Sequence, residues 1–461
     1  MAVLCVARRS LEVDEMSTDL LKICNDLVKL GEKMGADEIE VFAGAQNSME
    51  SGIENTDVKL AKRSIGSSIG IRVFRKKSLG FSSVNSLDQD RLEKAVKNAI
   101  ALSTNAPSDV HNGLPKPRKL RKISALTDKA VSAMSEEDIV EKINIMLAAA
   151  KSVDDRISID SGRFEAVYGE KAIANSLGVE GVEDYTGTFY DIGIHAVEGS
   201  NVSSVDYRMD GSRSLKGDTS EAVTRKLAES VIESLQAKKM ESCTGTLVLS
   251  PLATMEILIS PIFFSVDADN VQKGISRFAN KKSEKVAVDF LTIIDDGTIS
   301  GGLSSSAFDR EGVPHSRMPI IEKGELKAFL YDQYTANKEH IESTGHASGG
   351  PRGVPSIDAT NIQVSPGKDT VDQLISSVRK GLYVQRFSGR VDSVSGDFSG
   401  IAKMSRKIDS GALSGVVRET MISGNVYEVL MNLQAVSKET EKILDFVLPH
   451  FVVSDITITS E

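Results

Sequence analysis

Residues 69–84, IGIRVFRKKSLGFSSV, decide the fold class of this chain. Ile69, Ile71 and Val73 stand at every second position, which is the spacing of a β-strand with one buried face. The charged run at 75–78 then separates this strand from a second run of β-forming residues. The pattern predicts a β-hairpin, and therefore an antiparallel sheet.

Helix and strand signals on both sides of the hairpin extend this unit. Two β-like runs precede it, at 38–43 and 49–54. Before them, apolar residues at helical spacing begin after an N-cap at Ser17 and stop at Gly35. A second helix begins after Asp88. The order helix, four strands, helix is typical of an α+β fold rather than of a doubly wound parallel sheet.

Proline and glycine divide the rest of the chain. Three of the eleven prolines fall in one polar stretch that ends near residue 121, which predicts a domain boundary there. Beyond residue 243, short β-rich runs and many glycines indicate a curved, barrel-like sheet. The expected divisions are a disordered N-terminal extension, 1–16; an N-terminal α+β unit, 17–107; a second α+β unit, 118–240; and a β-rich, barrel-like C-terminal domain, 241–461.

Composition and charge exclude several classes of protein. The chain has 461 residues, of which 40% are hydrophobic and 26% charged, and its formal net charge is −10. That charge argues against nucleic-acid binding, and no apolar run approaches the ~20 residues of a membrane span. Three scattered cysteines fit neither a disulfide framework nor a paired-cysteine metal site. We therefore expect a cytoplasmic protein with no nucleic-acid or membrane partner.

The usual catalytic motifs are missing from the sequence. It contains no phosphate-binding loop, dinucleotide fingerprint or nucleophile elbow. Four of the six histidines are isolated: His111, His195, His315 and His450. The other two, His340 and His346, accompany Glu339, but a spacing of six places them on different faces of a helix. We expect a solvated loop here, and a zinc site built from these three residues is the weaker alternative.

Several ordered motifs resemble the TldD/PmbA family. The first, IGSSIGIRVFRKKSLGFSSVNSLD, resembles the first domain of that family. Four others resemble its C-terminal half, among them FDREGVPHSRMPIIEKGELKAFLYDQYTANK and VVRETMISGNVYEVLMNL. In chain order, the five motifs occupy 65–88, 308–338, 365–369, 383–402 and 416–433. The resemblance extends over nearly the whole chain.

The resemblance implies a paired assembly. In this family a TldD-type subunit carries a zinc-binding His-Glu-x-x-x-His helix, and a PmbA/TldE-type subunit lacks it. The matching segment of this chain places Ile259, Ser260 and Phe264 where the first His, the Glu and the second His would stand. Ile and Phe have no lone pair for zinc, and Ser cannot act as the carboxylate base. We therefore expect no catalytic residue and no cofactor in this chain, and we expect 257–264 to pack as a buried apolar element.

The expected function is that of a non-catalytic, peptide-binding subunit of a TldD/TldE-type zinc metallopeptidase complex that acts on unfolded or extended peptides. Its partner would be a TldD-like catalytic subunit that holds the zinc, or a second copy of this chain. Two alternatives stay open. One is an active metallopeptidase with other ligands, such as Glu339, His340 and His346. The other is a homodimeric peptide-binding protein without an enzyme partner.

The glycine- and serine-rich run at 383–400 predicts a strand, a tight turn and a second strand with an accessible backbone. It is the candidate peptide-binding surface, because an extended peptide can add main-chain hydrogen bonds along a strand edge. The candidate contacts are Arg386, Phe387, Ser388, Gly389, Arg390, Asp397 and Phe398. The arginines would hold a carboxylate. In the alternative, structural reading the phenylalanines are core residues and the arginines pair with Asp392 and Asp397.

Overall fold

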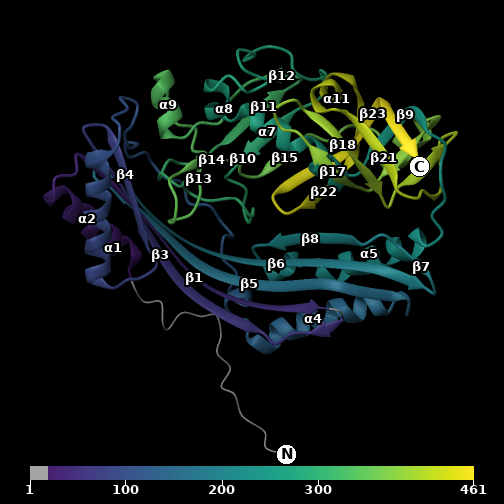
Figure 1. The fold of residues 1–461 in the computed structure, drawn as a ribbon, viewed down its shortest axis with the longest axis horizontal. Coiled ribbons are helices and arrows are strands. Elements are labelled where there is room, and N and C mark those ends of the chain that lie inside the picture. Colours follow the sequence, from purple (N-terminus) through teal and green to yellow (C-terminus); the bar gives the residue numbers. More distant parts are fainter. Residues whose placement is uncertain (1–18, 55, 461) are drawn as a thin grey trace, which may run out of the picture.

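The computed structural model describes residues 19–54 and 56–460. The extension expected at 1–16 therefore lies outside the described residues. The chain forms an N-terminal sheet backed by helices, and a β-rich C-terminal layer lies over the other face of that sheet (Figure 1). This arrangement confirms the expected α+β class.

The N-terminal layer is built on one antiparallel sheet. In the described residues this sheet has eight strands: β1 (Glu38–Glu54), β2 (Asp57–Val58), β3 (Lys62–Arg75), β4 (Ser78–Val84), β5 (Ile157–Asn175), β6 (Glu180–Glu198), β7 (Asn201–Val202) and β8 (Asp206–Ser212). The helical elements are α1 (Leu20–Lys33), α2 (Gln89–Asn105), α3 (Lys129–Ser132), α4 (Glu136–Lys151), the 3-10 turn Leu215–Gly217 and α5 (Ser220–Ser234). Because β1 pairs with both β3 and β5, both expected α+β units contribute strands to the same sheet.

Local signals in the first unit are confirmed. β3 and β4 form the expected antiparallel hairpin. Lys76 and Lys77 at its turn have φ values of 48° and 65°, as a two-residue hairpin loop that matches the strand twist requires. Asp88 caps α2, because its carboxylate accepts the backbone N–H of Arg91 at 3.1 Å.

Two boundaries differ from expectation. The runs 38–43 and 49–54 belong to one unbroken strand, β1. The residues between them, 44–48, stay in the strand because β3 and β5 pair with both of its edges there, and this pairing overrides weak local propensity. The first helix begins at Leu20 after an Asp19 cap, and the expected cap at Ser17 lies outside the described residues.

Two apolar cores lie between the N-terminal sheet and its helices. One joins α1 and α2 to β1 and β3, with Val41 and Ile71 fully buried. The other joins α4 and α5 to β5 and β6, with Phe164 and Ile192 fully buried. The sheet is curved, and α1, α2 and α4 lie on its outer side, away from the C-terminal layer (Figure 1).

The C-terminal layer is a mixed sheet. Its thirteen strands in the described residues are β9 (Cys243–Leu249), β10 (Ile293–Asp296), β11 (Arg317–Glu322), β12 (Glu325–Leu326), β15 (Ile362–Val364), β16 (Lys380–Val384), β17 (Arg386–Val391), β18 (Asp397–Lys403), β19 (Arg406–Asp409), β20 (Ala412–Val416), β21 (Thr420–Asn425), β22 (Leu433–Ile443) and β23 (Phe446–Ser460). A separate pair is formed by β13 (Ala347–Ser348) and β14 (Ser356–Ile357). Among these strands the sheet stays open rather than closing into a barrel, because its path ends at β12 and β20.

The C-terminal layer also contains short helical elements. They are α6 (Pro251–Thr254), a π-helical turn (Met255–Ile259), α7 (Ser260–Val266), α8 (Ala268–Gln272), α9 (Gln333–Glu339), α10 (Val371–Ser377) and α11 (Val426–Asn432). The turn and α7 pack into a large apolar core with strands from both ends of the layer. No helix in the described parts of the chain is long and apolar enough to span a membrane.

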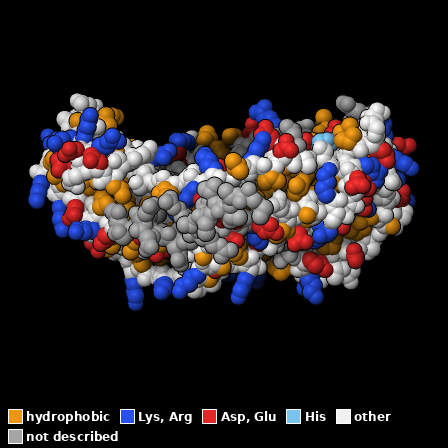
Figure 2. Space-filling model, turned by 90° about the horizontal axis from the view of Figure 1, so that it is seen from below, with side chains coloured by type: hydrophobic (Ala, Val, Ile, Leu, Met, Phe, Trp, Pro, Cys, Tyr) orange, Lys and Arg blue, Asp and Glu red, His pale blue; other side chains and the backbone are white. Residues whose placement is uncertain are grey.

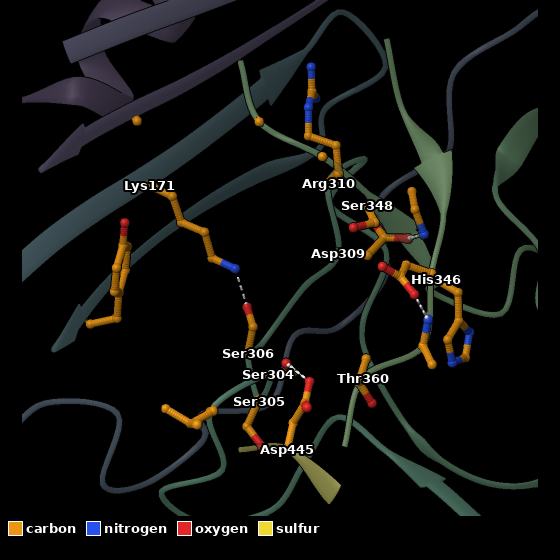
Figure 3. Close-up of a pocket in the computed structure, with 18 of the residues that line it drawn as sticks. Lys171, Ser304, Ser305, Ser306, Asp309, Arg310, His346, Ser348, Thr360 and Asp445 are labelled. Atoms are coloured by element: carbon orange, nitrogen blue, oxygen red, sulfur yellow. Dashed lines mark hydrogen bonds between the residues drawn. The ribbon is translucent and has the colours of Figure 1, made fainter. Parts of the chain in front are cut away.

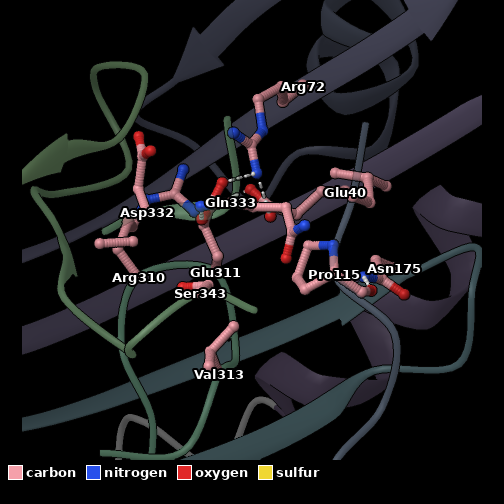
Figure 4. A network of polar contacts seen from close by, with 12 residues as sticks. Glu40, Arg72, Pro115, Asn175, Arg310, Glu311, Val313, Asp332, Gln333 and Ser343 are labelled. Atoms are coloured by element: carbon pink, nitrogen blue, oxygen red, sulfur yellow. Dashed lines mark hydrogen bonds and ion pairs between the residues drawn. The ribbon is translucent and has the colours of Figure 1, made fainter. Parts of the chain in front are cut away.

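A buried network of charged side chains ties the two layers together (Figure 4). Arg72 Nη2 on β3 lies 2.7 Å from Glu40 Oε2 on β1 and 2.7 Å from Glu311 Oε1 of the C-terminal layer. Arg310 Nη1 lies 2.9 Å from Glu40 Oε1, and its guanidinium lies 4.1 Å from the centroid of the Phe42 ring. Because all four charged side chains are almost fully buried, this network fixes how the layers face each other.

Candidate functional site

A cleft of about 1390 Å³ lies between the two layers. On the N-terminal side, residues of β1, β3, β5 and β6 line it. On the C-terminal side its walls are α7, the loop at 303–310 and the hairpin β13–β14. Side chains from both layers, such as Lys171 and Ser306, point into the same space (Figure 3). The cleft is therefore the place where a ligand would contact both layers.

The segment at 257–264 forms one wall of the cleft. The buried side chains on one face of this segment, such as Ile257 and Ile262, belong to the C-terminal core. Ile259, Ser260 and Phe264 line the cleft on the other face. The expectation of a buried apolar element is thus correct for one face and wrong for the other, because the cleft exposes it.

The cleft-facing side chains of this wall suit contact rather than metal chemistry. Ile259 and Phe264 offer hydrocarbon, and the Ser260 hydroxyl is bound to the Ser393 hydroxyl at 2.8 Å. Within the described ranges no group of three or more His, Cys, Asp or Glu side chains is arranged to hold a metal ion. The arrangement can pack against apolar side chains of a ligand.

The alternative zinc ligands do not meet in one place. Glu339 at the end of α9 accepts a hydrogen bond of 2.8 Å from the Tyr331 hydroxyl. His340 follows with a left-handed φ of 54° and is exposed. His346 is buried, and its Nε2 lies 3.0 Å from Asp295 Oδ2. The structure therefore does not bring Glu339, His340 and His346 together as the ligands of one metal ion.

Lys171, which the sequence did not single out, lines the cleft (Figure 3). Lys171 on β5 donates hydrogen bonds to the Ser306 hydroxyl at 2.5 Å and to the Phe308 carbonyl at 3.4 Å. Its Nζ lies 3.5 Å from Glu183 Oε1. Burial lowers the pKa of Lys171, while the Glu183 charge opposes that shift. The sequence signal that could have identified Lys171 is its position directly before the apolar run Ala-Ile-Ala of a strand.

Two titratable groups of the C-terminal wall also have pKa values that differ from their ordinary values. His315, one of the isolated histidines, lines the cleft, and burial lowers its pKa to about 3. Burial, with a contribution from Glu311, raises the pKa of Asp309 to about 8. Three backbone N–H groups donate to the Asp309 carboxylate at 2.8 to 3.0 Å and oppose that rise. Both groups therefore favour neutral forms on this wall.

The run at 383–400 forms the expected hairpin, β17–β18, but its arginine is used internally. Arg386 is 6% exposed, and its guanidinium lies 2.7 Å from Asp206 Oδ1 and 3.1 Å from Glu256 Oε1. It also lies 3.7 Å from the centroid of the Tyr207 ring. These partners come from β8 and the π-helical turn, whereas the structural reading expected them within the run itself.

The two phenylalanines of this hairpin are core residues. Phe387 and Phe398 are buried and meet edge to face with ring centroids 6.0 Å apart. Gly389 faces Gly400 so closely that a Cβ on Gly389 would lie 2.4 Å from the Gly400 Cα. The structural reading is confirmed for the phenylalanines, and the glycines serve the close approach of two strands.

The remaining candidates of the run lie at its polar end. Arg390 is largely exposed, and its Nη2 is 3.7 Å from Asp392. Asp397 accepts a hydrogen bond from the Asn425 side chain at 2.8 Å. Ser388 is partly exposed on β17. Within this fully described run, Ser393 alone lines the cleft, so the seven proposed contacts do not face it.

The cleft contains an unpaired strand edge elsewhere, on β3. β3 pairs with β1 along nearly its whole length, but with β4 only from Ile69 onward. Over 62–68 no described strand pairs with the second edge of β3, and residues 64–68, SIGSS, line the cleft. A Cβ on Gly66 would meet no atom within 4 Å. This edge offers free backbone groups beside small side chains.

Known proteins show the same organisation. The chain matches the PmbA/TldA metallopeptidase domain 1 over 39–103, the central domain over 129–235 and the C-terminal domain over 242–460. A metalloprotease PmbA homologue of Buchnera aphidicola subsp. Acyrthosiphon pisum is 25% identical over 444 residues, which cover 94% of this chain and 95% of that protein. A metalloprotease TldD homologue of the same strain is 26% identical over 402 residues, which cover 84% of this chain and 82% of that protein.

Solved structures show the same fold. The crystal structure of TldE from Thermococcus kodakarensis superposes with a TM-score of 0.86 at 24% identity and covers 94% of this chain and 99% of that chain. At this level of identity the similarity concerns the fold. The three domain matches together span most of the described residues, so the chain belongs to the PmbA/TldD metallopeptidase family.

Proposed function

We propose that this chain is a non-catalytic, peptide-binding subunit that works with a zinc-bearing TldD-like subunit. One observation carries the proposal. Ile259, Ser260 and Phe264, which the family resemblance places at the positions of the zinc ligands and the base, line the large cleft instead of lying in the buried core. The wall is thus retained as a surface, while its side chains have no group that could hold zinc or activate water.

The β3 edge is the best place for the main chain of the peptide. A strand edge with free N–H and C=O groups binds an extended peptide by adding one more strand, largely independently of its sequence. The free stretch, 62–68, matches about seven residues of peptide, or roughly 23 Å at ~3.3 Å per residue. Gly66 and the neighbouring serines leave space beside it. This edge replaces β17–β18 as the proposed contact.

The cleft wall opposite would contact side chains of the peptide. Ile259, Phe263 and Phe264 are each only partly buried and all line the cleft. An apolar side chain of the ligand would bury part of this surface and gain roughly 25 cal/mol per Å². The proposed ligand is therefore an unfolded or extended peptide with apolar side chains, bound by backbone pairing.

Reconstitution with a TldD-type subunit tests the proposal. We expect no cleavage of an unfolded peptide by this chain alone, cleavage by the mixture, and a 1:1 complex on gel filtration. Peptide binding by the chain alone is measured separately, by fluorescence anisotropy. Chelator-sensitive cleavage by the chain alone would favour an independent metallopeptidase, and a stable homodimer that binds peptide but never pairs would favour a binding protein without an enzyme partner.

A further inference from the structure

A hairpin of the C-terminal layer reaches across the cleft to the N-terminal sheet. β13 and β14 pair through Ala347 with Ile357 and Ser348 with Ser356. The segment GGPRGVP between these strands forms the tip of the hairpin. The first part of the tip, 349–353, lines the same cleft as β1 and β3. The hairpin therefore spans the gap between the layers.

Pro351 of the tip lies against the sheet at two glycines. A Cβ on Gly70 of β3 would lie 2.2 Å from the Pro351 carbonyl oxygen, and one on Gly44 of β1 would lie 3.4 Å from Pro351 Cγ. β1 and β3 are neighbouring strands, so the two glycines together form a notch for the proline. Since even a methyl group at Gly70 would collide with the backbone of the tip, the seat depends on the absence of a side chain there.

The rest of the tip is rich in glycine, and its residues 349, 350 and 352–354 are exposed. A Cβ on Gly350 or Gly353 would meet no atom within 4 Å, and Gly349 has a φ of 114° that other residues rarely adopt. Arg352, next to the seated proline, is exposed. Glycines on both sides of Pro351 allow the tip to swing without disturbing either layer.

We propose that the hairpin at 347–357 is a strap that closes the cleft by seating Pro351 in the notch of Gly44 and Gly70, and that its release opens the cleft. The seating of the hairpin involves residues of this chain only. The statement that release admits a peptide rests on the proposed function, whereas the opening itself does not.

Limited trypsin digestion of the full chain tests the seating, because trypsin cleaves after Arg352 only when the tip is free. Gly70→Ala should unseat the tip and raise the rate of cleavage at this bond by about tenfold, as proteolysis follows the population of the open form. Gly415→Ala on β20 is the matched control, since a Cβ at this position would meet no atom within 4 Å and should leave the rate unchanged. Pro351→Gly removes the seated ring without adding bulk and should also raise the rate.

Access to the cleft is measured without any peptide. Phe264→Cys places a thiol on the cleft wall, and mass spectrometry follows its reaction with a bulky maleimide at that residue. We expect faster reaction when Pro351→Gly is combined with it. Wild-type cleavage after Arg352 in both Gly70→Ala and Pro351→Gly would overturn the seating. Faster cleavage with an unchanged maleimide rate would overturn the closing role. Failure of peptides to bind would count against the proposed function and leave both results standing.

Discussion

Arg72→Met should destabilise the protein strongly, because it breaks the buried network of Figure 4. Arg72 contacts Glu40 and Glu311 at 2.7 Å each, and the side chains of both acids are 0% exposed. Methionine fills similar space but leaves Glu40 with Arg310 alone and Glu311 without the arginine that pairs with it. Removing one partner from a buried pair costs about 3–5 kcal/mol, since the charge left behind is not solvated. An exposed pair contributes roughly 0–1 kcal/mol.

Thermal unfolding of the full chain measures this effect. At ~2 °C per kcal/mol for a unit of this size, the midpoint should fall by about 6–10 °C. Arg163→Met is the control, because Arg163 is 48% exposed and pairs with Asp191 at 3.1 Å, and its shift should stay within about 2 °C.

The pH dependence of the Arg72→Met deficit provides a second check. Burial already raises the pKa of Glu311, and loss of Arg72 raises it further. The folded variant then binds a proton more readily than the unfolded chain, so its deficit relative to the wild type should shrink as the pH falls from about 7 to 5. A deficit no larger than that of Arg163→Met, or one that is independent of pH, would refute the reasoning.

Three further predictions follow from single sites. Burial lowers the pKa of His315 to about 3 from 6.5, so its stabilising contribution is present above pH 6.5 and is lost as the pH falls. Between pH 7 and 5 the free energy of unfolding, measured in urea, should fall by ~2 kcal/mol more in the wild type than in His315→Gln. Equal losses in the two proteins would contradict this. Gly389→Val should lower the unfolding midpoint, at a cost of about 1–3 kcal/mol or more, because its Cβ collides with Gly400, whereas Ser388→Val should not. Gly66→Val should keep the unfolding midpoint of the wild type, because space is open around this residue. It should nevertheless weaken the binding of an extended peptide by about tenfold in fluorescence anisotropy. Wild-type affinity in this variant would show that the peptide does not bind along β3.

The features predicted from sequence are those that neighbouring residues determine. The hairpin at 69–84 follows from alternation and a short charged turn, and the cap at Asp88 follows from one side chain and the next helical turn. The hairpin at 383–400 follows from its glycine and serine spacing. The resemblance to a family supplied an expectation that local patterns lack, namely that the segment around Ile259, Ser260 and Phe264 corresponds to a zinc-binding helix.

The features that sequence did not predict depend on which distant segments meet. Lys171 lies on a strand and His315 on a loop of the other layer, and nothing in either local pattern places both in one cleft. The sequence suggests that Arg386 pairs with acids near it in the chain, but in the fold its partner is Asp206, far upstream. The free edge of β3 exists because β4 ends opposite Ile69, and its meaning appears only when the sheet order is known.

Zinc stoichiometry of the isolated, full-length chain tests the central claim most directly. The purified chain is saturated with zinc, desalted, and its metal content measured by elemental analysis beside a TldD-type subunit treated in the same way. The account predicts far less than one equivalent in this chain, because the side chains of Ile259, Ser260 and Phe264 on the cleft wall include no imidazole, carboxylate or thiolate that could hold zinc, and one equivalent in the TldD-type subunit. One tightly bound equivalent in this chain, lost together with peptide cleavage on chelation, would contradict it.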